Sequence, residues 1–341
     1  MKTNLTAAAL LSAFCLLPSA FAQGVLTPPG PPAPTMKSLD QIEARIAITN
    51  TSTLAKISLP GSYYLTHNLT VTGGDAIHIN TNGVTLDLNG FTISSTAPGA
   101  AGYAISLGNS VSDITIANGH IRGGVTNNGA GAYTGNGFAY GIYYTSGEPA
   151  NVFVSHVSVS GCLYHGIFLN NATATTVEAC AVQTVGSYGI FASTIKDSSA
   201  LDCGSVAMDG EEVSNCHGQS SGDTGILANT AQNCYGESDG GGIGLEATTA
   251  LNCEGLSATE EGLNATTAQN CYGVSGGAGF GIVASIVNNS YGFSETGYGV
   301  YASDIANASY GYSNGGTGLY AFIGNACSGT TENVTHKYNM P

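Results

Sequence analysis

The fold is decided by residues 225–275, which read GILANTAQNCYGESDGGGIGLEATTALNCEGLSATEEGLNATTAQNCYGVS. A segment of the form Gly-(Ile/Leu/Val)-x-Ala recurs here and continues towards the C-terminus. Its glycines are Gly225, Gly244, Gly262, Gly281, Gly299 and Gly318, with steps of 19, 18, 19, 18 and 19 residues. A short fixed period predicts a solenoid, in which each repeat is one coil that buries its apolar face only against its neighbours.

A second phrase, typically Asn-Cys-Tyr-Gly, lies between these segments and predicts two stacked columns of side chains. One column is cysteine with serine in two coils: Cys162, Cys180, Cys216, Cys234, Cys253, Cys271, Ser290, Ser309 and Cys327. The column before it is Asn215, Asn233, Asn252, Asn270 and Asn289. Because asparagine tolerates left-handed turns and its amide can bond to a neighbouring coil, we expect a turn of stacked asparagines.

The cysteine column has two interpretations. In one, the thiols are small inward groups that fill a narrow core, since free cysteine is among the most buried residue types. In the other, they form disulfides or bind a metal. Stacked neighbours lie about 4.8 Å apart, whereas disulfides prefer Cβ atoms about 3.8 Å apart, and the close cysteine pairs of zinc sites are absent. We favour the core interpretation, leave bridges open in irregular coils, and predict no metal site and no cofactor.

The N-terminus predicts export. Lys2, an apolar stretch over residues 7–17 and the small-residue pattern Ala20-Phe21-Ala22 are typical of a secretory signal. No later apolar run is long enough for a membrane helix. The predicted product is secreted or held at the cell surface, and a periplasmic location is also open.

The organisation along the chain follows from changes in pattern. Leu39, Ile42 and Ile46 have helical spacing and predict a short cap before the first coil. The predicted parts are a signal peptide (1–22), a proline-rich spacer (23–37), a cap helix with lead-in (38–57), the β-helix (58–334) and a C-terminal tail (335–341).

Two segments depart from the period. Cys203 and Cys216 are 13 residues apart, which is short for a coil, and residues 209–212 between them read as an acidic insertion. Residues 127–137 are rich in glycine, alanine and asparagine and predict a loop.

Charge excludes one class of partner. The formal net charge is −15, and no lysine or arginine occurs between Asp197 and His336. We therefore predict no nucleic-acid partner, because nucleic-acid binding depends on basic side chains meeting phosphates.

Residues 83–93 (GVTLDLNGFTI), their echo at 112–123 (SDITIANGHIRG) and the two columns carry a resemblance to a known family. With them the chain resembles right-handed parallel β-helix proteins of the pectin-lyase-like superfamily. The resemblance implies an all-β fold with a single right-handed parallel β-helix. Many such proteins cleave or bind polysaccharides and others are adhesins, so that fold alone does not fix the function.

The catalytic patterns of that family are not matched. Its lyases use acidic residues to hold calcium and an arginine or lysine as base, whereas Lys56, Arg122, Lys196 and Lys337 are scattered here. Its hydrolases carry a Gly-His-Gly signature, and the nearest segment, residues 164–166, reads Tyr-His-Gly. No catalytic residue is carried over.

Acidic residues offer a weaker catalytic hypothesis. An inverting glycosidase needs two carboxyl groups roughly 6.5–9.5 Å apart. The crowded candidates are Asp197, Asp202, Asp209, Glu211, Glu212 and Asp223. A solvated acidic loop is the favoured alternative. The pairs His120 with Arg122, and His165 with Lys196, are further candidates that we expect to be structural or exposed.

The outward residue of Gly-(Ile/Leu/Val)-x-Ala gives the main functional hypothesis. By strand alternation, this column contains Tyr143, Phe168, Phe191, Leu227, Glu246, Asn264, Val283, Tyr301 and Tyr320. Exposed aromatic rows are typical of contact surfaces, and flat rings can stack on sugars. Tyr143, Phe168, Phe191, Tyr301 and Tyr320 are the glycan-contact candidates. Scattered exposed rings, or a face covered by residues 127–137, are the alternatives.

Three functions follow as hypotheses. The first is an exported, non-catalytic surface or glycan-contacting protein, whose partner would be a polysaccharide or a cell-surface glycan. The second is a polysaccharide lyase or glycoside hydrolase with its site on the longer coils, residues 114–223. The third is a purely structural or adhesive element.

Overall fold

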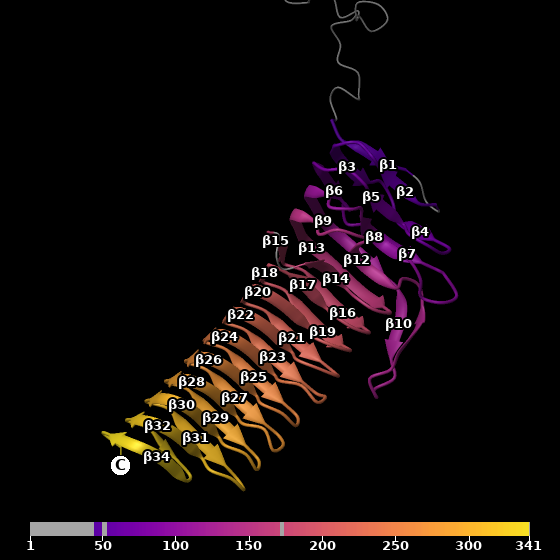
Figure 1. Ribbon diagram of the computed structural model, residues 1–341. Coiled ribbons are helices and arrows are strands. Elements are labelled where there is room, and N and C mark those ends of the chain that lie inside the picture. Colours follow the sequence, from indigo (N-terminus) through magenta and orange to yellow (C-terminus); the bar gives the residue numbers. More distant parts are fainter. Residues whose placement is uncertain (1–43, 50–52, 171–173, 341) are drawn as a thin grey trace, which may run out of the picture. The chain divides into compact units, whose positions relative to one another are not determined.

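The computed structural model describes residues 44–49, 53–170 and 174–340. Within these ranges the chain is all β and contains no helix, and therefore none that could cross a membrane. Thirty-two strands form one continuous sheet, which winds into a parallel β-solenoid of about 15 turns (Figure 1). The predicted signal, the spacer and most of the cap helix lie outside the described residues, and paired strands extend from Ile46 to Tyr338.

Strand pairing divides each coil among three faces. Face A contains β2 (Ala55–Ile57), β5 (Ile77–Ile79), β8 (Tyr103–Leu107), β12 (Tyr140–Tyr144), β14 (Ile167–Asn170), β17 (Ile190–Ala192) and the first halves of β20 (Met208–Ser214), β22 (Ile226–Gln232), β24 (Leu245–Leu251), β26 (Leu263–Gln269), β28 (Ile282–Asn288), β30 (Val300–Asn307), β32 (Leu319–Asn325) and β34 (Glu332–Tyr338).

Face B contains β1 (Ile46–Ile48), β3 (Gly61–Leu65), β6 (Val84–Asp87), the first halves of β9 (Ser112–Arg122) and β13 (Ala150–Cys162), β15 (Thr175–Glu178), β18 (Thr194–Lys196) and the second halves of β20 to β34 named above. Face C contains β4 (Leu69–Val71), β7 (Thr92–Ser95), the second halves of β9 and β13, β16 (Ala181–Val185), β19 (Ser199–Cys203), β21 (His217–Ser220), β23 (Tyr235–Ser238), β25 (Glu254–Ser257), β27 (Tyr272–Ser275), β29 (Tyr291–Ser294), β31 (Tyr310–Ser313) and β33 (Ser328–Gly329).

The regular coils are narrow. In β22 alternate residues point inward, as strand geometry requires, and the buried ones are Ile226, Ala228 and Ala231. One inward position of the same coil on face C is Gly236, where an added Cβ would lie 2.3 Å from the carbonyl oxygen of Gly244. The approach of the neighbouring backbone leaves no room for a side chain at this position.

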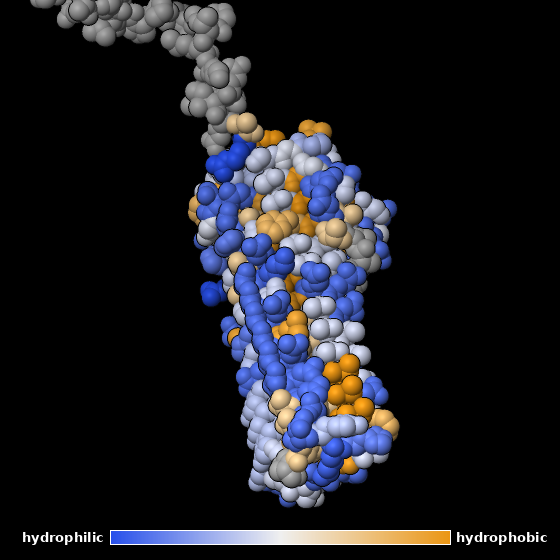
Figure 2. All heavy atoms as spheres, turned by 90° about the vertical axis from the view of Figure 1, so that its left-hand side faces the viewer, coloured by the Kyte–Doolittle hydropathy of each residue, from blue (hydrophilic) through white to orange (hydrophobic). Residues whose placement is uncertain are grey.

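The turn from face B to face C carries the predicted stack of asparagines, which we call the amide ladder. Asn233 has a φ of 54° and donates from Nδ2 to Oδ1 of Asn215 at 3.0 Å. The same bond joins Asn215 to Asp197, Asn252 to Asn233, and Asn270 to Asn252 at 2.9, 3.1 and 3.1 Å. The prediction is confirmed for the bonded stack from Asn215 to Asn270, and Asn289 shares the left-handed turn with a φ of 48°. A line of hydrophilic residues along the solenoid is visible in Figure 2.

The residues after this turn form the cysteine column, and their thiols are free and buried. Each member donates its side-chain hydrogen to the carbonyl oxygen two residues earlier; the members are Cys180, Ser198, Cys216, Cys234, Cys253, Cys271, Ser290, Ser309 and Cys327. Oγ of Ser290 also accepts the N–H of Cys271 from the preceding coil at 3.0 Å. The column therefore selects small side chains that carry a hydrogen-bond donor, and small size is not its only requirement.

The placement of Cys162 in this column was wrong. Cys162 pairs with Val185, which pairs with Cys203, so both cysteines belong to a second inward column at the end of face C. Later coils fill that column with Ser220, Ser238, Ser257, Ser275, Ser294 and Ser313. The error arose because Cys162 lies 18 residues before Cys180, whereas the coil in this region is longer, with Val159 paired to Val182.

The predicted acidic insertion at residues 209–212 is also wrong. Strand β20 pairs with β22 over its length without a register shift. Met208 takes the inward position that Ile190 and Ile226 fill in the neighbouring coils. These residues thus form a regular coil.

The predicted loop at residues 127–137 is in part a hairpin. Strands β10 (Gly124–Asn127) and β11 (Tyr133–Asn136) pair antiparallel. The Tyr133 hydroxyl bonds to Oδ1 of Asp202 at 2.8 Å and to Oγ of Ser221 at 2.9 Å. Since Asp202 lies in β19 and Ser221 directly follows β21, these bonds fasten the hairpin at the C-terminal end of the face C strands.

Candidate functional site

The predicted aromatic column exists on face A and contains one residue that was missed. Tyr143 pairs with Phe168, and Phe168 with Phe191. Phe191 pairs next with Asp209, which in turn pairs with Leu227. The 18-residue steps from Phe191 to Asp209 and on to Leu227 could have placed Asp209 in this column. The repeat motif was not recognised there because Met208 and Gly210 replace the usual Ile and Ala on either side of the outward residue.

A second column lies beside the first, at the position directly before each repeat glycine or, in one coil, before Ala207. Backbone hydrogen bonds between successive coils align its members, which include Tyr140, His165, Tyr188, Val206, Thr224, Ile243, Glu261, Phe280, Tyr298 and Thr317. Sequence reasoning missed this column, although an aromatic residue before the glycine is visible in several repeats. We call it the edge column, and the first one the outer column.

The two columns together form an N-terminal aromatic patch. Its rings belong to Tyr103, Tyr140, Tyr143, Tyr144, Tyr164, His165, Phe168, Tyr188 and Phe191. Phe168 is central, with its ring centroid 5.2 Å from Tyr143, 4.6 Å from Phe191 and 4.5 Å from His165. Three of the five predicted glycan-contact candidates therefore lie in one cluster.

The other two candidates belong to a separate C-terminal aromatic patch. Tyr301 and Tyr320 stack at 4.6 Å, and Phe280 and Tyr298 from the edge column contact Tyr301 at 5.6 and 5.5 Å. Six coil steps of about 4.8 Å separate Phe191 from Tyr301, or about 29 Å. Between the patches the outer column is mixed, with Asp209, Leu227, Glu246, Asn264 and Val283.

Burial sets the protonation of the N-terminal patch. It lowers the pKa of His165 to about 4, so the imidazole is neutral at physiological pH. It raises the pKa of Asp209 to about 6. Burial, together with the charges of Asp209 and Asp223, raises the pKa of the Tyr188 hydroxyl. The patch thus presents neutral rings and hydroxyl groups, beside a carboxyl group that titrates near pH 6.

The six acidic candidates are dispersed over the solenoid. Asp197 ends the amide ladder, and Asp202 is bonded to Tyr133 of the hairpin. Glu211 and Glu212 are exposed at the bend between faces A and B. The charges of Asp209 and Asp223 both raise the pKa of Tyr188. These two of the six candidates therefore lie near the same residue of the N-terminal aromatic patch.

The histidine pairs have different outcomes. His120 and Arg122 lie together on face C, exposed, at a small depression of about 250 Å³. His165 belongs to the edge column of face A, whereas Lys196 is an exposed residue of face B. The second pair is therefore divided between two faces.

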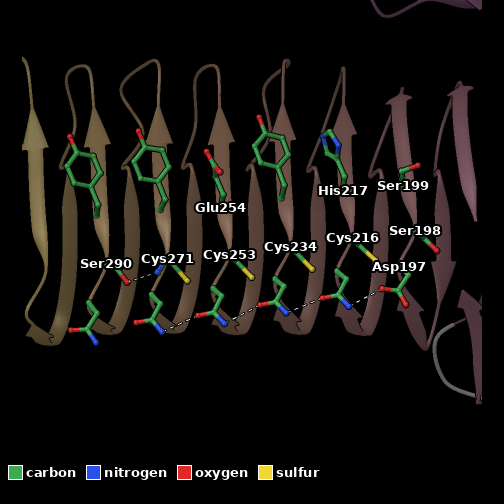
Figure 3. A pocket seen from close by; sticks show the side chains of 18 of the residues that line it. Asp197, Ser198, Ser199, Cys216, His217, Cys234, Cys253, Glu254, Cys271 and Ser290 are labelled. Atoms are coloured by element: carbon green, nitrogen blue, oxygen red, sulfur yellow. Dashed lines mark hydrogen bonds between the residues drawn. The ribbon is translucent and has the colours of Figure 1, made fainter. Parts of the chain in front are cut away.

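A long open groove of about 1350 Å³ runs along the turn between faces B and C (Figure 3). The amide ladder forms one bank, and the first outward residues of the face C strands form the other. The cysteine column forms the floor, where Cys216, Cys234, Cys253 and Cys271 are at most 4% exposed. The sequence predicted the amides and the thiols of this groove, but not the groove itself.

Within the described residues, no three His, Cys, Asp or Glu side chains are grouped so that they could hold a metal ion. No protein-family model matches the chain, and no curated protein is detectably similar to it in sequence.

Proposed function

We propose that this chain is an exported, non-catalytic surface protein that contacts a polysaccharide through face A. The observation that carries the proposal is the pair of aromatic patches on the same columns of one face. Aromatic side chains offer large apolar area with a polar edge, and tyrosine adds a hydroxyl group. A pyranose ring has the complementary surface, with apolar C–H faces and a rim of hydroxyl groups.

The dimensions favour a polymer over a small sugar. The patches are about 29 Å apart along the coil direction. In an extended 1,4-linked hexopyranose chain each sugar advances the chain by roughly one coil step, about 4.8 Å. A single extended chain along face A would therefore meet both patches and would gain from two-point attachment.

Charge narrows the type of polymer. Asp209, Glu246 and Glu261 lie in the stretch between the patches, and residues 198–335 contain no lysine or arginine. Polymers of uronic acids carry the same sign of charge and are disfavoured. We therefore propose a neutral polysaccharide as the ligand.

The test compares two double variants on a glycan array and in pull-down with insoluble polysaccharides. Phe168→Ala with Phe191→Ala removes the centre of the N-terminal patch. The matched control is Phe293→Ala with Tyr312→Ala, which removes a stacked pair of rings on face C. Retention should fall about tenfold or more in the first variant and stay unchanged in the second. Equal retention in both variants would remove the proposal.

A second function is favoured by Asp209. A carboxyl group with a raised pKa next to an aromatic surface is suited to general acid catalysis, and Asp223 acts on the same tyrosine. The alternative is therefore a polysaccharide lyase or glycoside hydrolase on these coils. Release of reducing ends or of unsaturated products by the purified chain, abolished by Asp209→Asn, would establish it over the non-catalytic proposal.

The location and the wider family belong to the same proposal. The pattern of residues 1–22 supports secretion or a cell-surface location, including the periplasm. The parallel solenoid and its amide ladder support a right-handed helix of the pectin-lyase-like kind. N-terminal sequencing of the exported protein would test the predicted cleavage after Ala22.

A further inference from the structure

The groove between faces B and C is a second surface with a regular chemical repeat. It extends over the coils from Cys180 to Tyr310, on a different side of the solenoid from the aromatic patches. Figure 3 shows Cys216, Cys234, Cys253 and Cys271 in line along it, with His217 and Glu254 on one side. Because the thiols are almost fully buried, a ligand here would meet the two banks and not the sulfur atoms.

The first bank has unused hydrogen-bonding capacity. An asparagine side chain has two N–H donors and two acceptor lone pairs. In the ladder, Asn215, Asn233 and Asn252 each spend one donor and one lone pair on their neighbours. All three side chains are exposed. One donor and one acceptor per coil therefore face the solvent, repeated at about 4.8 Å.

The second bank is aromatic. Tyr272, Tyr291 and Tyr310 form a stacked row with centroid distances of 5.3 and 5.5 Å. Tyr272 and Tyr310 are 40% and 38% exposed, which is high for side chains of this size. Their row ends at Glu254, and the rings of Tyr235 and His217 follow beyond it.

Charge along the groove is sparse. Asp197 is bonded to the ladder, and Glu254 contributes a second carboxylate. Burial lowers the pKa of His217, which keeps its ring neutral at physiological pH. An uncharged ligand fits this lining better than an anionic one.

We propose that this groove is a second binding site, independent of face A, for an extended, uncharged β-1,4-linked glycan that lies along the coils. Its hydroxyl groups would pair with the free amide N–H and C=O groups of the ladder, and its sugar rings would contact the tyrosine row. The ligand is argued from its advance per unit, because each sugar of such a chain advances it by roughly one coil step, about 4.8 Å, so that every coil meets one sugar. Successive sugars are turned over relative to one another, but each presents hydroxyl groups at the edges of the chain. A peptide strand advances by about 3.3 Å per residue and does not stay in step with the coils.

The experiment uses cellohexaose and chitohexaose as probes in isothermal titration calorimetry on the full exported chain. The parent protein carries Phe168→Ala and Phe191→Ala, so that face A does not contribute. The groove variant adds Tyr272→Ser and Tyr291→Ser. The matched control adds Val274→Ser and Phe293→Ser, which lie on the same strands, β27 and β29, outside the groove lining.

We expect at least one probe to bind the parent, with affinity about tenfold weaker in the groove variant and unchanged in the control. Far-UV circular dichroism of all three proteins excludes misfolding as the cause. Absence of binding to the parent, equal loss in groove variant and control, or preference for an extended peptide over both probes would overturn the proposal. Face A is tested separately, by measuring whether Phe168→Ala with Phe191→Ala in the wild-type background loses polysaccharide retention.

Discussion

The early and late coils of the solenoid have the same strand pairing but different interiors. In the early coils the fully buried side chains are large, as with Leu65, Leu86 and Ile105. In a late coil one large apolar side chain, Leu245, is fully buried, and other inward positions are small, such as Ala247, Ala250 and Ser257. The early part depends on apolar volume, whereas the late part has less apolar volume to bury.

The late coils replace that volume with repeated hydrogen bonds. Most of them add an amide bond between coils, together with a thiol or hydroxyl bond in the cysteine column and a serine in the second inward column. Ser257, for example, donates to the carbonyl of Gly242 at 2.7 Å. One net hydrogen bond contributes about 1 kcal/mol. Many small hydrogen-bond contributions therefore stabilise the late coils, whereas a few large buried side chains stabilise the early coils.

The largest effect is expected where volume is lost from an early coil. Leu86→Ala removes a side chain that is 0% exposed and should lower the free energy of unfolding by about 2–5 kcal/mol. Urea denaturation followed by circular dichroism measures the loss. The neighbouring outward residue provides the control, since Thr85→Ala should change stability by at most about 0.5 kcal/mol. Similar losses for the two variants would mean that the early coils do not depend on a packed core.

In a late coil the decisive group should be a hydrogen bond. Cys234 donates to the carbonyl of Gln232 at 3.2 Å. Cys234→Ala should cost about 1–2 kcal/mol, because a buried hydrogen bond and the contacts of the sulfur atom are lost, although the carbonyl of Gln232 keeps the N–H of Asn215. Cys234→Ser keeps the side-chain donor and should cost less. The same denaturation experiment ranks the two. If serine proves worse than alanine here, the column is an apolar core after all, and the contrast between the two regions disappears.

The sequence predicts the late coils well because their chemistry repeats at one spacing. The glycine period and the Asn215–Asn270 column were sufficient to predict stacked coils and the amide ladder, both of which the structure has. A turn that needs a positive φ favours asparagine in the successive repeats, as at Asn233 and Asn252.

The irregular positions were not predictable in the same way. Ser198 and Met208 perform the roles of cysteine and isoleucine with other residue types, so that one coil was missed and Asp209 was assigned to an insertion. The outer aromatic column was predicted by alternation, but the edge column depends on how the turns between faces C and A align. Side-chain burial, which sets the pKa of Asp209, follows only from that alignment.

Asp209, at the end of the N-terminal aromatic patch, should make the free energy of unfolding depend on pH. Asp209 has a folded-state pKa of about 6, above its ordinary value of 3.8, so the folded chain holds more protons than the unfolded one between these pH values. Stability should therefore fall as pH rises from about 4 to about 6, by about 1 kcal/mol after allowance for solvent screening. His165 acts in the opposite direction, since its lowered pKa makes stability rise with pH between about 4 and 6.5.

The two opposed contributions are separable by substitution. Asp209→Asn should leave the rising contribution of His165, and His165→Phe should leave the falling contribution of Asp209. Melting temperatures measured from pH 4 to 7 give both slopes. A wild-type-like profile in both variants would show that neither group titrates in the patch.

The smallest expected effect is a gain in the last coils, where the ladder turn lacks its usual residue. Ala308 and Ala326 have φ values of 46° and 52° at the turn position that Asn233 and Asn252 occupy in earlier coils. Alanine in a left-handed conformation costs roughly 1–2 kcal/mol, and asparagine relieves part of this cost. Ala308→Asn should therefore raise stability by about 0.5–1 kcal/mol.

Ala302→Asn, at a fully buried position of the same coil, should be destabilising, which separates the turn effect from a general effect of asparagine. One residue before Ala308, Asn307 already donates to Asn288 at 2.8 Å, so the amide bond of this coil is present without an asparagine at the turn. A loss of stability in Ala308→Asn would therefore show that asparagine stabilises the ladder through its amide bonds and not through the turn conformation.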